Sequence, residues 1–182
     1  MNQGSLYSDL GDHPTDYWGS SYLQTSDIDL ANDHASIEPI GISGNTFTGE
    51  YDGGLFHIKN WSYTGTLENS GLFGDCSGCV LKRIRVAGVW TMTFTQGNAG
   101  FVCGKCVEST IYDVAGNFSE GTLFSSQIHN ATGVLFGLVN DSTAHGLSVL
   151  GSVNFGSTCD GFFVGGVLGN CNRVTLSHAR NL

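Results

Sequence analysis

The chain has 182 residues, enough for one domain with a substantial hydrophobic core. Only 13% of the residues are charged and 11% are aromatic, a composition that excludes an intrinsically disordered chain. The net charge is −9, and no Lys or Arg precedes Lys59, so we expect no nucleic-acid partner. The one small basic group, Lys82, Arg83 and Arg85, is interpreted as a solvated strand face.

Membrane and export signals are the next classes to consider. No apolar run approaches the ~18 residues of a membrane-spanning helix, so we expect no membrane span. Residues 1–20 lack the basic and apolar regions of a signal peptide. The interpretation is a chain made and used inside a cell. The alternative is a cell-surface or extracellular protein whose export signal was removed.

The first third of the chain predicts strands after an irregular start. Residues 1–20 are polar and acidic and predict an irregular N-terminal segment. Alternation around Tyr22, Ile28 and Leu30 then predicts a first strand. Residues 21–70 are expected to hold the leading strands and the first coil of a repeated fold.

Residues 39–60 carry the clearest strand period. Phe47 and Tyr51 alternate with polar residues and are expected on one buried side. The Asp52-Gly53-Gly54 step predicts a tight turn, because glycine supplies the positive φ that such a turn requires. Phe56 and Ile58 are expected to point the same way in the next strand.

Residues 71–182 are expected to form repeated coils. A glycine or Gly-Thr step followed by two apolar residues occurs at Gly71-Leu72-Phe73, Gly100-Phe101-Val102, Gly121-Thr122-Leu123-Phe124, Gly137-Leu138-Val139 and Gly161-Phe162-Phe163. Apolar alternations follow these starts, at Ile84/Val86, Ile111/Val114, Val134/Phe136, Leu147/Val149 and Val174/Leu176. A unit of about twenty residues cannot bury its apolar face alone, but stacked units can.

The sequence therefore predicts an all-β parallel β-helix, or β-solenoid, of about five to seven irregular coils. Residues 1–182 form one domain in this interpretation, with glycine at the corners of the coils. An antiparallel sandwich is the competing arrangement. Recurrence of the same apolar pair at each coil start favours stacking.

These motifs resemble a known family. The segments SDIDL, PIG, FTGEYDGG, an F-x-I-x-N step, GLFG and the I-x-V repeats are similar to GLUG-motif repeats over about residues 20–178. GLUG repeats occur in bacterial adhesins and other surface proteins. The resemblance implies a right-handed parallel β-helix with a structural or adhesive role and no catalytic residues.

Cysteine gives the sharpest local signal. Cys76-Ser-Gly-Cys79 and Cys103-Gly-Lys-Cys106 form two C-x2-C pairs with 23 residues between them. Four thiolates at such a spacing can close a structural zinc site, and disulfides or free thiols are the alternatives. Cys79 and Cys106 both precede Val and lie five residues before an Ile, so the repeat predicts that these two stack on adjacent rungs. We expect free thiols and no metal or cofactor, with no evident partner for Cys159 and Cys171.

Acidic residues offer weaker candidates. Asp27 and Asp29, with Asp33 and His34, suggest either a calcium site or turn capping, and capping is favoured. The later acids appear scattered and are expected at non-equivalent coil positions, which gives no paired acid and base: Glu108, Asp113, Glu120, Asp141 and Asp160. We expect no enzyme and no catalytic or cofactor-binding residues.

The expected function is a non-catalytic structural module in a larger assembly, with a virion minor capsid or cement component as the specific case. Residues 162–176 are expected to abut another protein subunit. The alternative is an adhesive or carbohydrate-binding module that uses Trp61, Tyr63 and Trp90 as exposed aromatics. A polysaccharide-processing β-helix enzyme is the third interpretation.

Overall fold

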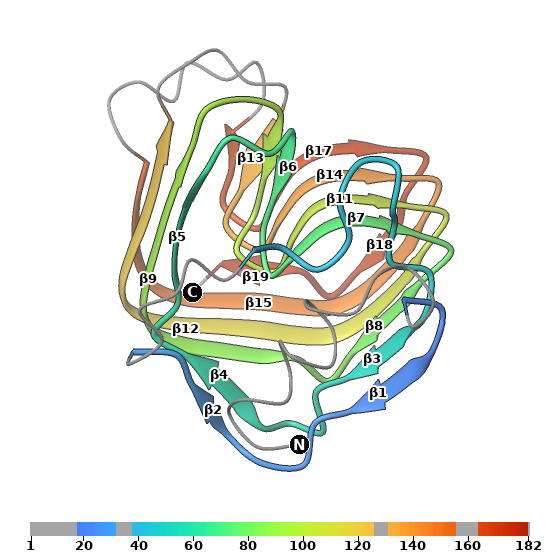
Figure 1. The fold of residues 1–182 in the computed structure, drawn as a ribbon. Helices are drawn as coiled ribbons and strands as arrows, with labels where there is room; N and C mark the ends of the chain where they lie inside the picture. The colour runs from blue at the N-terminus through green and yellow to red at the C-terminus, as the bar shows by residue number, and fades with distance from the viewer. Residues whose placement is uncertain (1–17, 32–37, 126–130, 156–163, 182) are drawn as a thin grey trace.

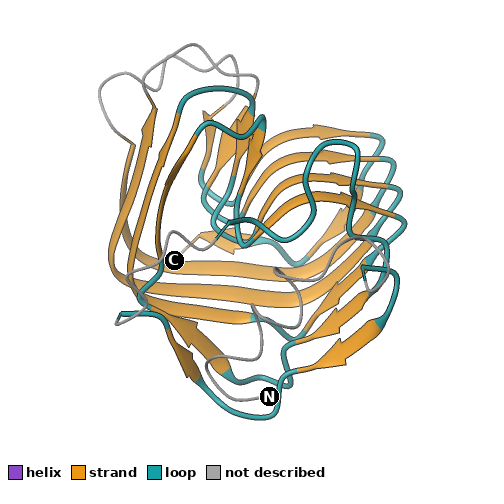
Figure 2. Cartoon of the chain, viewed as in Figure 1, coloured by secondary structure: helices purple, strands orange, loops and turns teal. Residues whose placement is uncertain are grey.

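The protein is an all-β parallel solenoid of about four turns in a computed structural model, which confirms the predicted fold class (Figures 1 and 2). The structure describes residues 18–31, 38–125, 131–155 and 164–181. No helix occurs within these ranges, so the described residues contain no helix long and apolar enough to cross a membrane. Most of the expected N-terminal segment, residues 1–20, lies outside them.

Three parallel sheets form the walls of the coil. The large sheet contains β1 (Ser21–Leu23), β2 (Ile28–Asp29), β3 (Glu50–Asp52), β4 (His57–Lys59), β5 (Ser62–Gly65), β8 (Val80–Lys82), β9 (Arg85–Phe94), β12 (Thr110–Ser125), β15 (Thr143–Phe155), β18 (Thr175–Ser177) and β19 (Arg180–Asn181). A second sheet contains β6 (Asn69–Ser70), β10 (Asn98–Ala99), β13 (Ala131–Gly133) and β16 (Val164–Gly165). The third contains β7 (Phe73–Ser77), β11 (Cys103–Val107), β14 (Phe136–Asn140) and β17 (Leu168–Asn172). Figure 1 shows β12 and β15 bending around two sides of the coil.

One column of buried residues defines the register. Tyr51 pairs with Leu81, Leu81 with Ile111, and Ile111 with Ala144, and all four side chains are fully buried. Residues that touch across neighbouring turns are 28 to 33 positions apart in the chain. The predicted unit of about twenty residues is therefore wrong, and so is the count of five to seven coils.

Glycines in two different columns explain this error. Gly71 and Gly100 follow the paired residues Ser70 and Ala99, so these two starts are equivalent. The next members of that column are Gly133 and Gly165. A Cβ on Gly100 would lie 2.6 Å from the carbonyl oxygen of Leu135, which is why this column needs glycine.

Two of the other predicted starts do not belong to this column. Gly121 lies inside β12, opposite Trp90, and Gly137 lies inside β14. Gly137 belongs to a second glycine column, because the adjacent Leu138 pairs with Lys105, which follows Gly104. The start Gly161-Phe162-Phe163 lies outside the described residues. Each turn thus contains more than one glycine step, which shortens the apparent period.

The core runs along the axis of the coil. The predicted inward residues Phe47, Phe73, Val102 and Val139 are all fully buried and belong to one continuous cluster. Four of the five predicted alternations are buried: Ile84/Val86, Ile111/Val114, Val134/Phe136 and Leu147/Val149. Phe47 contacts Phe73 with ring centroids 5.1 Å apart, so aromatic packing continues from one turn to the next.

Corners of the coil adopt left-handed backbone conformations. Gly78, Glu108, Asp141 and Arg173 occupy one corner column, with φ values of 64°, 52°, 51° and 52°. The prediction of glycine at the corners is therefore wrong for three of these four positions. A non-glycine residue costs roughly 1–2 kcal/mol in this conformation, so stacking of the flanking strands must hold these corners in place.

The predicted turn after β3 is present. Gly54 has φ +60°, and the N–H of Phe56 donates to the carbonyl of Gly53 at 2.9 Å. Phe56 and Ile58 do not share one environment, however, because Ile58 is fully buried and Phe56 is 37% exposed. Phe56 still belongs to the turn, so the strand period begins only at β4.

Candidate functional site

Three buried thiols meet between adjacent turns of the coil. Cys76 lies in β7, and Cys103 and Cys106 lie in the neighbouring strand β11. Their Sγ atoms all lie within 4.8 Å of one another. The Sγ atoms of Cys103 and Cys106 are 2.9 Å apart.

Cys79 adds a fourth thiol to this cluster. It follows Gly78, whose positive φ turns the chain at the corner between β7 and β8. Cys79 is buried, and its thiol interacts with the thiols of Cys76 and Cys106. Its Sγ also lies 3.4 Å from Ser109 Oγ. The four side chains Cys76, Cys79, Cys103 and Cys106 are called the cysteine cluster below.

The register of the cluster differs from the prediction. Cys106 pairs with Cys76, not with Cys79. Cys79 aligns instead with Ser109, because the residues that follow them, Val80 and Thr110, pair with each other. The two Cys-Val steps look alike in sequence but lie on opposite sides of a corner, so local similarity gave the wrong alignment. Cys76 and Cys103 also lie close together, with Sγ atoms within 4.8 Å of each other.

Two adjacent turns contribute all the thiols of the cluster that belong to the described residues. In the next turn the column of Cys76 and Cys106 continues with Val139, and Cys171 follows it. Cys171 is exposed and is separated from Cys106 by Val139. Cys159 lies outside the described residues.

Mutual hydrogen bonding makes the four thiols unequal. Hydrogen bonds with Cys106 and Cys76 lower the pKa of Cys79 to about 4. Burial opposes ionisation of Cys103, yet hydrogen bonds with the same two thiols lower its pKa to about 7. Burial raises the pKa of Cys76 and of Cys106 well above the usual range. Two thiols thus donate hydrogen bonds to two sulfurs that ionise more readily, which is a coupled titration of one unit.

The predicted acidic calcium candidates are engaged by other groups. Asp27 accepts hydrogen bonds from Lys59 Nζ at 2.6 Å and from the N–H of His57, which lower its pKa. Asp29 accepts from Asn60 Nδ2 and from the N–H of Ala31. These contacts fit the capping interpretation. Asp33 and His34 lie outside the described residues.

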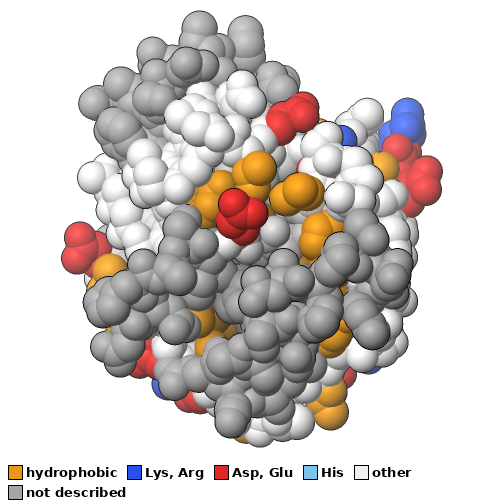
Figure 3. Space-filling model, viewed as in Figure 1, with side chains coloured by type: hydrophobic (Ala, Val, Ile, Leu, Met, Phe, Trp, Pro, Cys, Tyr) orange, Lys and Arg blue, Asp and Glu red, His pale blue; other side chains and the backbone are white. Residues whose placement is uncertain are grey.

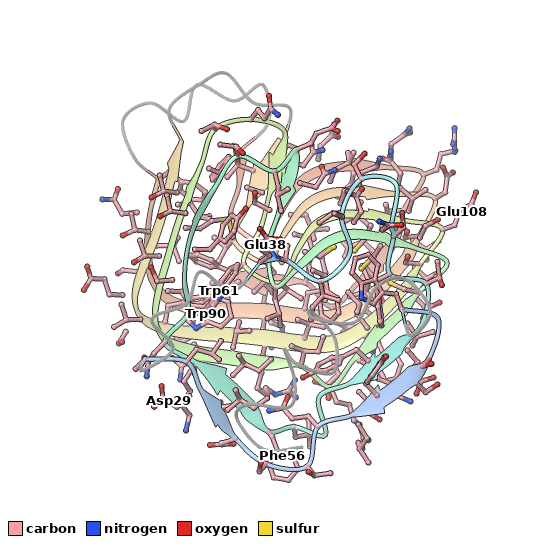
Figure 4. All side chains as sticks on the ribbon, in the orientation of Figure 1. Asp29, Glu38, Phe56, Trp61, Trp90 and Glu108 are labelled. Carbon is pink, nitrogen blue, oxygen red and sulfur yellow. The ribbon has the colours of Figure 1, made fainter. Side chains whose placement is uncertain are left out.

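One expectation about the later acids is wrong. Glu108 and Asp141 do occupy equivalent positions, because Val107 pairs with Asn140 immediately before them. Both lie at the outer corner of the coil, where Figure 4 shows Glu108 pointing away from the fold. Asp141 forms an ion pair with Arg173 of the next turn. Asp113 forms one with Arg85, and Asp160 lies outside the described residues.

The basic group is neutralised by neighbouring carboxylates. Lys82 contacts Glu50 at 2.6 Å, and Arg83 forms two hydrogen bonds with Asp52. Arg85 contacts Asp113 at 2.6 Å. On the face shown in Figure 3, the few Lys and Arg side chains (blue) form no continuous patch among the described residues.

The expected exposure of the aromatic residues is wrong. Trp61 is 1% exposed, Trp90 is 0% exposed and Tyr63 is 3% exposed. Trp61 and Tyr63 stack with ring centroids 5.6 Å apart, and Figure 4 shows both labelled tryptophans inside the coil. Strand alternation continued from Ile58 would place Trp61 and Tyr63 on the outer face, but the chain turns at Asn60, which has φ +57°. These side chains are core residues and present no face to a sugar.

Comparison with family models, with curated proteins and with solved structures finds no match for this chain. The resemblance to GLUG-motif repeats therefore stays a prediction.

Proposed function

We propose that this chain is a non-catalytic structural module of a larger assembly, in which another protein subunit stacks on its last turn. The observation that carries this proposal is the one-sided pairing of that turn. Among the described residues, β17 pairs only with β14, β16 only with β13, and β18 and β19 only with β15. Unpaired strand edges are sites for adding further strands, and solenoids need their terminal turns covered.

Side-chain burial supports the same proposal. Ala144 is fully buried, whereas its partner Leu176 in the last turn is 45% exposed. Val139 is fully buried, whereas its partner Cys171 is exposed. Phe136 is fully buried and its partner Leu168 is only partly so. Positions that are interior in one turn are thus open in the last turn, which suits a surface that another subunit covers.

The other functions expected from the sequence have less support. The interpretation as an adhesive or carbohydrate-binding module relied on Trp61, Tyr63 and Trp90 as exposed aromatic residues, and all three are buried. Placement in a virion stays a prediction, because no feature of the described residues bears on it.

Analytical ultracentrifugation of the purified chain tests the proposal, with a second copy as the simplest stacking subunit. We expect the average mass to rise with concentration, and we expect Leu176→Asp to abolish this rise because a carboxylate cannot enter an apolar contact. Val89→Asp is the matched control, since Val89 is also 45% exposed but lies on β9, away from the last turn. A chain that stays monomeric, with amides of the last turn as protected as those of the middle turns, would overturn the proposal.

A further inference from the structure

The cysteine cluster is a closed group of four sulfurs in the dry interior. Cys76, Cys103 and Cys106 are 0–1% exposed, and Cys79 is 1% exposed. Thiols form only weak hydrogen bonds, so four of them gain little from facing one another in an apolar core. A cation that binds all four sulfurs would give every one of them a strong partner.

The distances suit a tetrahedral metal site. Zinc binds thiolates at about 2.3 Å, so two sulfurs on a tetrahedron are about 3.8 Å apart. The Sγ atoms of Cys103 and Cys106 are 2.9 Å apart, and those of Cys76, Cys103 and Cys106 all lie within 4.8 Å of one another, a range that includes that value. Cys79 lies outside this group of three, and its thiol interacts with the thiols of Cys76 and Cys106 from the next corner.

The column that contains Cys103 also provides space. Cys103 pairs with Phe73 on one side and with Phe136 on the other, and both phenylalanines are fully buried. Cys103 is the one small side chain between two large ones in a close-packed core. A bound ion at this level would occupy volume that the phenyl rings fill in the adjacent turns.

We propose that Cys76, Cys79, Cys103 and Cys106 bind one zinc ion as a structural tetrathiolate site that joins two neighbouring turns. The sulfurs bind as thiolates, so each thiol that is still protonated releases its proton to solvent when the ion binds. The two C-x2-C pairs each supply both ligands from one turn, which is the ligand spacing of closed structural zinc sites. The site is independent of the stacking of subunits on the last turn.

A disulfide explains the cluster less well. Bonded sulfurs are about 2.05 Å apart, and the Sγ atoms of Cys103 and Cys106 are separated by 2.9 Å. One bond between Cys103 and Cys106 would use only two of the four sulfurs, and a second bond between Cys76 and Cys79 would need a second oxidation. Zinc uses all four sulfurs without any oxidant.

Metal content and cobalt spectroscopy of the full chain test the site. We expect the protein purified under reducing conditions to carry about one zinc ion per chain, and Cys106→Ser to lose at least nine-tenths of it. Cys171→Ser is the matched control, because Cys171 lies in the same column without a neighbouring thiol among the described residues, and it should retain all of the zinc. Cobalt added to the metal-free wild-type chain should give the thiolate charge-transfer and d–d absorption of a tetrahedral site.

Two results would overturn the proposal. One is a folded wild-type chain with less than a tenth of an equivalent of zinc and no cobalt–thiolate absorption. The other is a chain mass lower than that of the fully reduced chain by two hydrogen atoms for each bonded pair, after purification under reducing conditions, which would show a disulfide. The cobalt titration uses the unmutated chain, so it decides the question even if Cys106→Ser fails to fold.

Discussion

Trp61 and Trp90 meet edge to face between two turns of the solenoid, with ring centroids 5.4 Å apart and an interplanar angle of 60°. Trp90 continues the contact to Phe101, at 5.6 Å and 65°. Aromatic pairs of this geometry add roughly 0.5–1.5 kcal/mol beyond the area they bury. The aromatic residues that first suggest a binding surface thus link one turn to the next.

The two tryptophans should respond differently to loss of the indole N–H. Trp90 Nε1 donates to the carbonyl of Ala87 at 2.8 Å, whereas Trp61 Nε1 is buried with no partner among the described residues. We therefore expect Trp90→Phe to lower the free energy of unfolding by about 1 kcal/mol more than Trp61→Phe. Urea unfolding followed by far-UV circular dichroism measures both. A larger loss for Trp61→Phe would contradict the hydrogen-bond assignment.

Backbone conformation at the corner column gives a second prediction. Gly78 and Glu108 both have positive φ, and nothing lies within 4 Å of a Cβ placed on Gly78. We expect Gly78→Ala to destabilise the fold by about 1 kcal/mol and Glu108→Gly to stabilise it by a similar amount, through backbone strain alone. Thermal unfolding should show shifts of opposite sign, and shifts of the same sign would exclude this explanation.

Close approach of neighbouring turns predicts a larger effect at Gly100. Its φ is not strained, but a Cβ there would lie 2.6 Å from both the carbonyl oxygen of Leu135 and the Cα of Phe136. Because two backbones must separate to admit the methyl group, we expect Gly100→Ala to cost several times as much as Gly78→Ala. The same thermal unfolding series provides the comparison. Equal costs would mean that the register of adjacent turns is wrong.

The ion pair of Asp52 and Arg83 makes stability depend on acid pH. Arg83 Nε and Nη2 donate to the two oxygens of Asp52 at 2.7 and 2.5 Å, and these hydrogen bonds lower the pKa of Asp52 to about 2. A carboxylate with a lowered pKa contributes stability above its unfolded pKa of about 3.9 and loses it as the pH falls through the folded value. We expect Asp52→Asn to be less stable than the wild type at pH 6.

This difference should shrink steadily as the pH falls from about 4 through about 2, and it should vanish at still lower pH, where Asp52 is protonated in both the folded and the unfolded state. Urea midpoints at a series of pH values measure it. Glu120→Gln, at an exposed position of β12, serves as the control and should match the wild type throughout. A difference between Asp52→Asn and the wild type that does not change with pH would contradict the ion pair as its cause.

The fold class follows from the sequence because inward positions carry their signal locally. Ile111 and Leu147 lie in apolar alternations, and both are fully buried in long strands. The length of the turn does not follow, because a Gly-apolar step marks two different columns. Gly71 and Gly137 have similar neighbours, yet only the three-dimensional stacking shows that they lie on different parts of the turn.

The cysteine cluster shows the same division. The two C-x2-C pairs indicate in advance that four thiols can come together. Which of them pair in neighbouring strands depends on the corner after Ser77, where the chain turns at Gly78. Cys76 lies before this corner and Cys79 after it, so Cys76 is the strand partner of Cys106. Aromatic exposure also depended on a corner, at Asn60. The positive φ of a non-glycine residue has only a weak signature in sequence.

Hydrogen exchange of the isolated chain at low concentration tests the central claim, an open last turn, most directly. We predict that amides of β17 and β18 exchange much faster than those of β11 and β12, and that they become protected when the chain associates. Protection of β17 and β18 in the dilute monomer, equal to that of the middle strands, would contradict the claim.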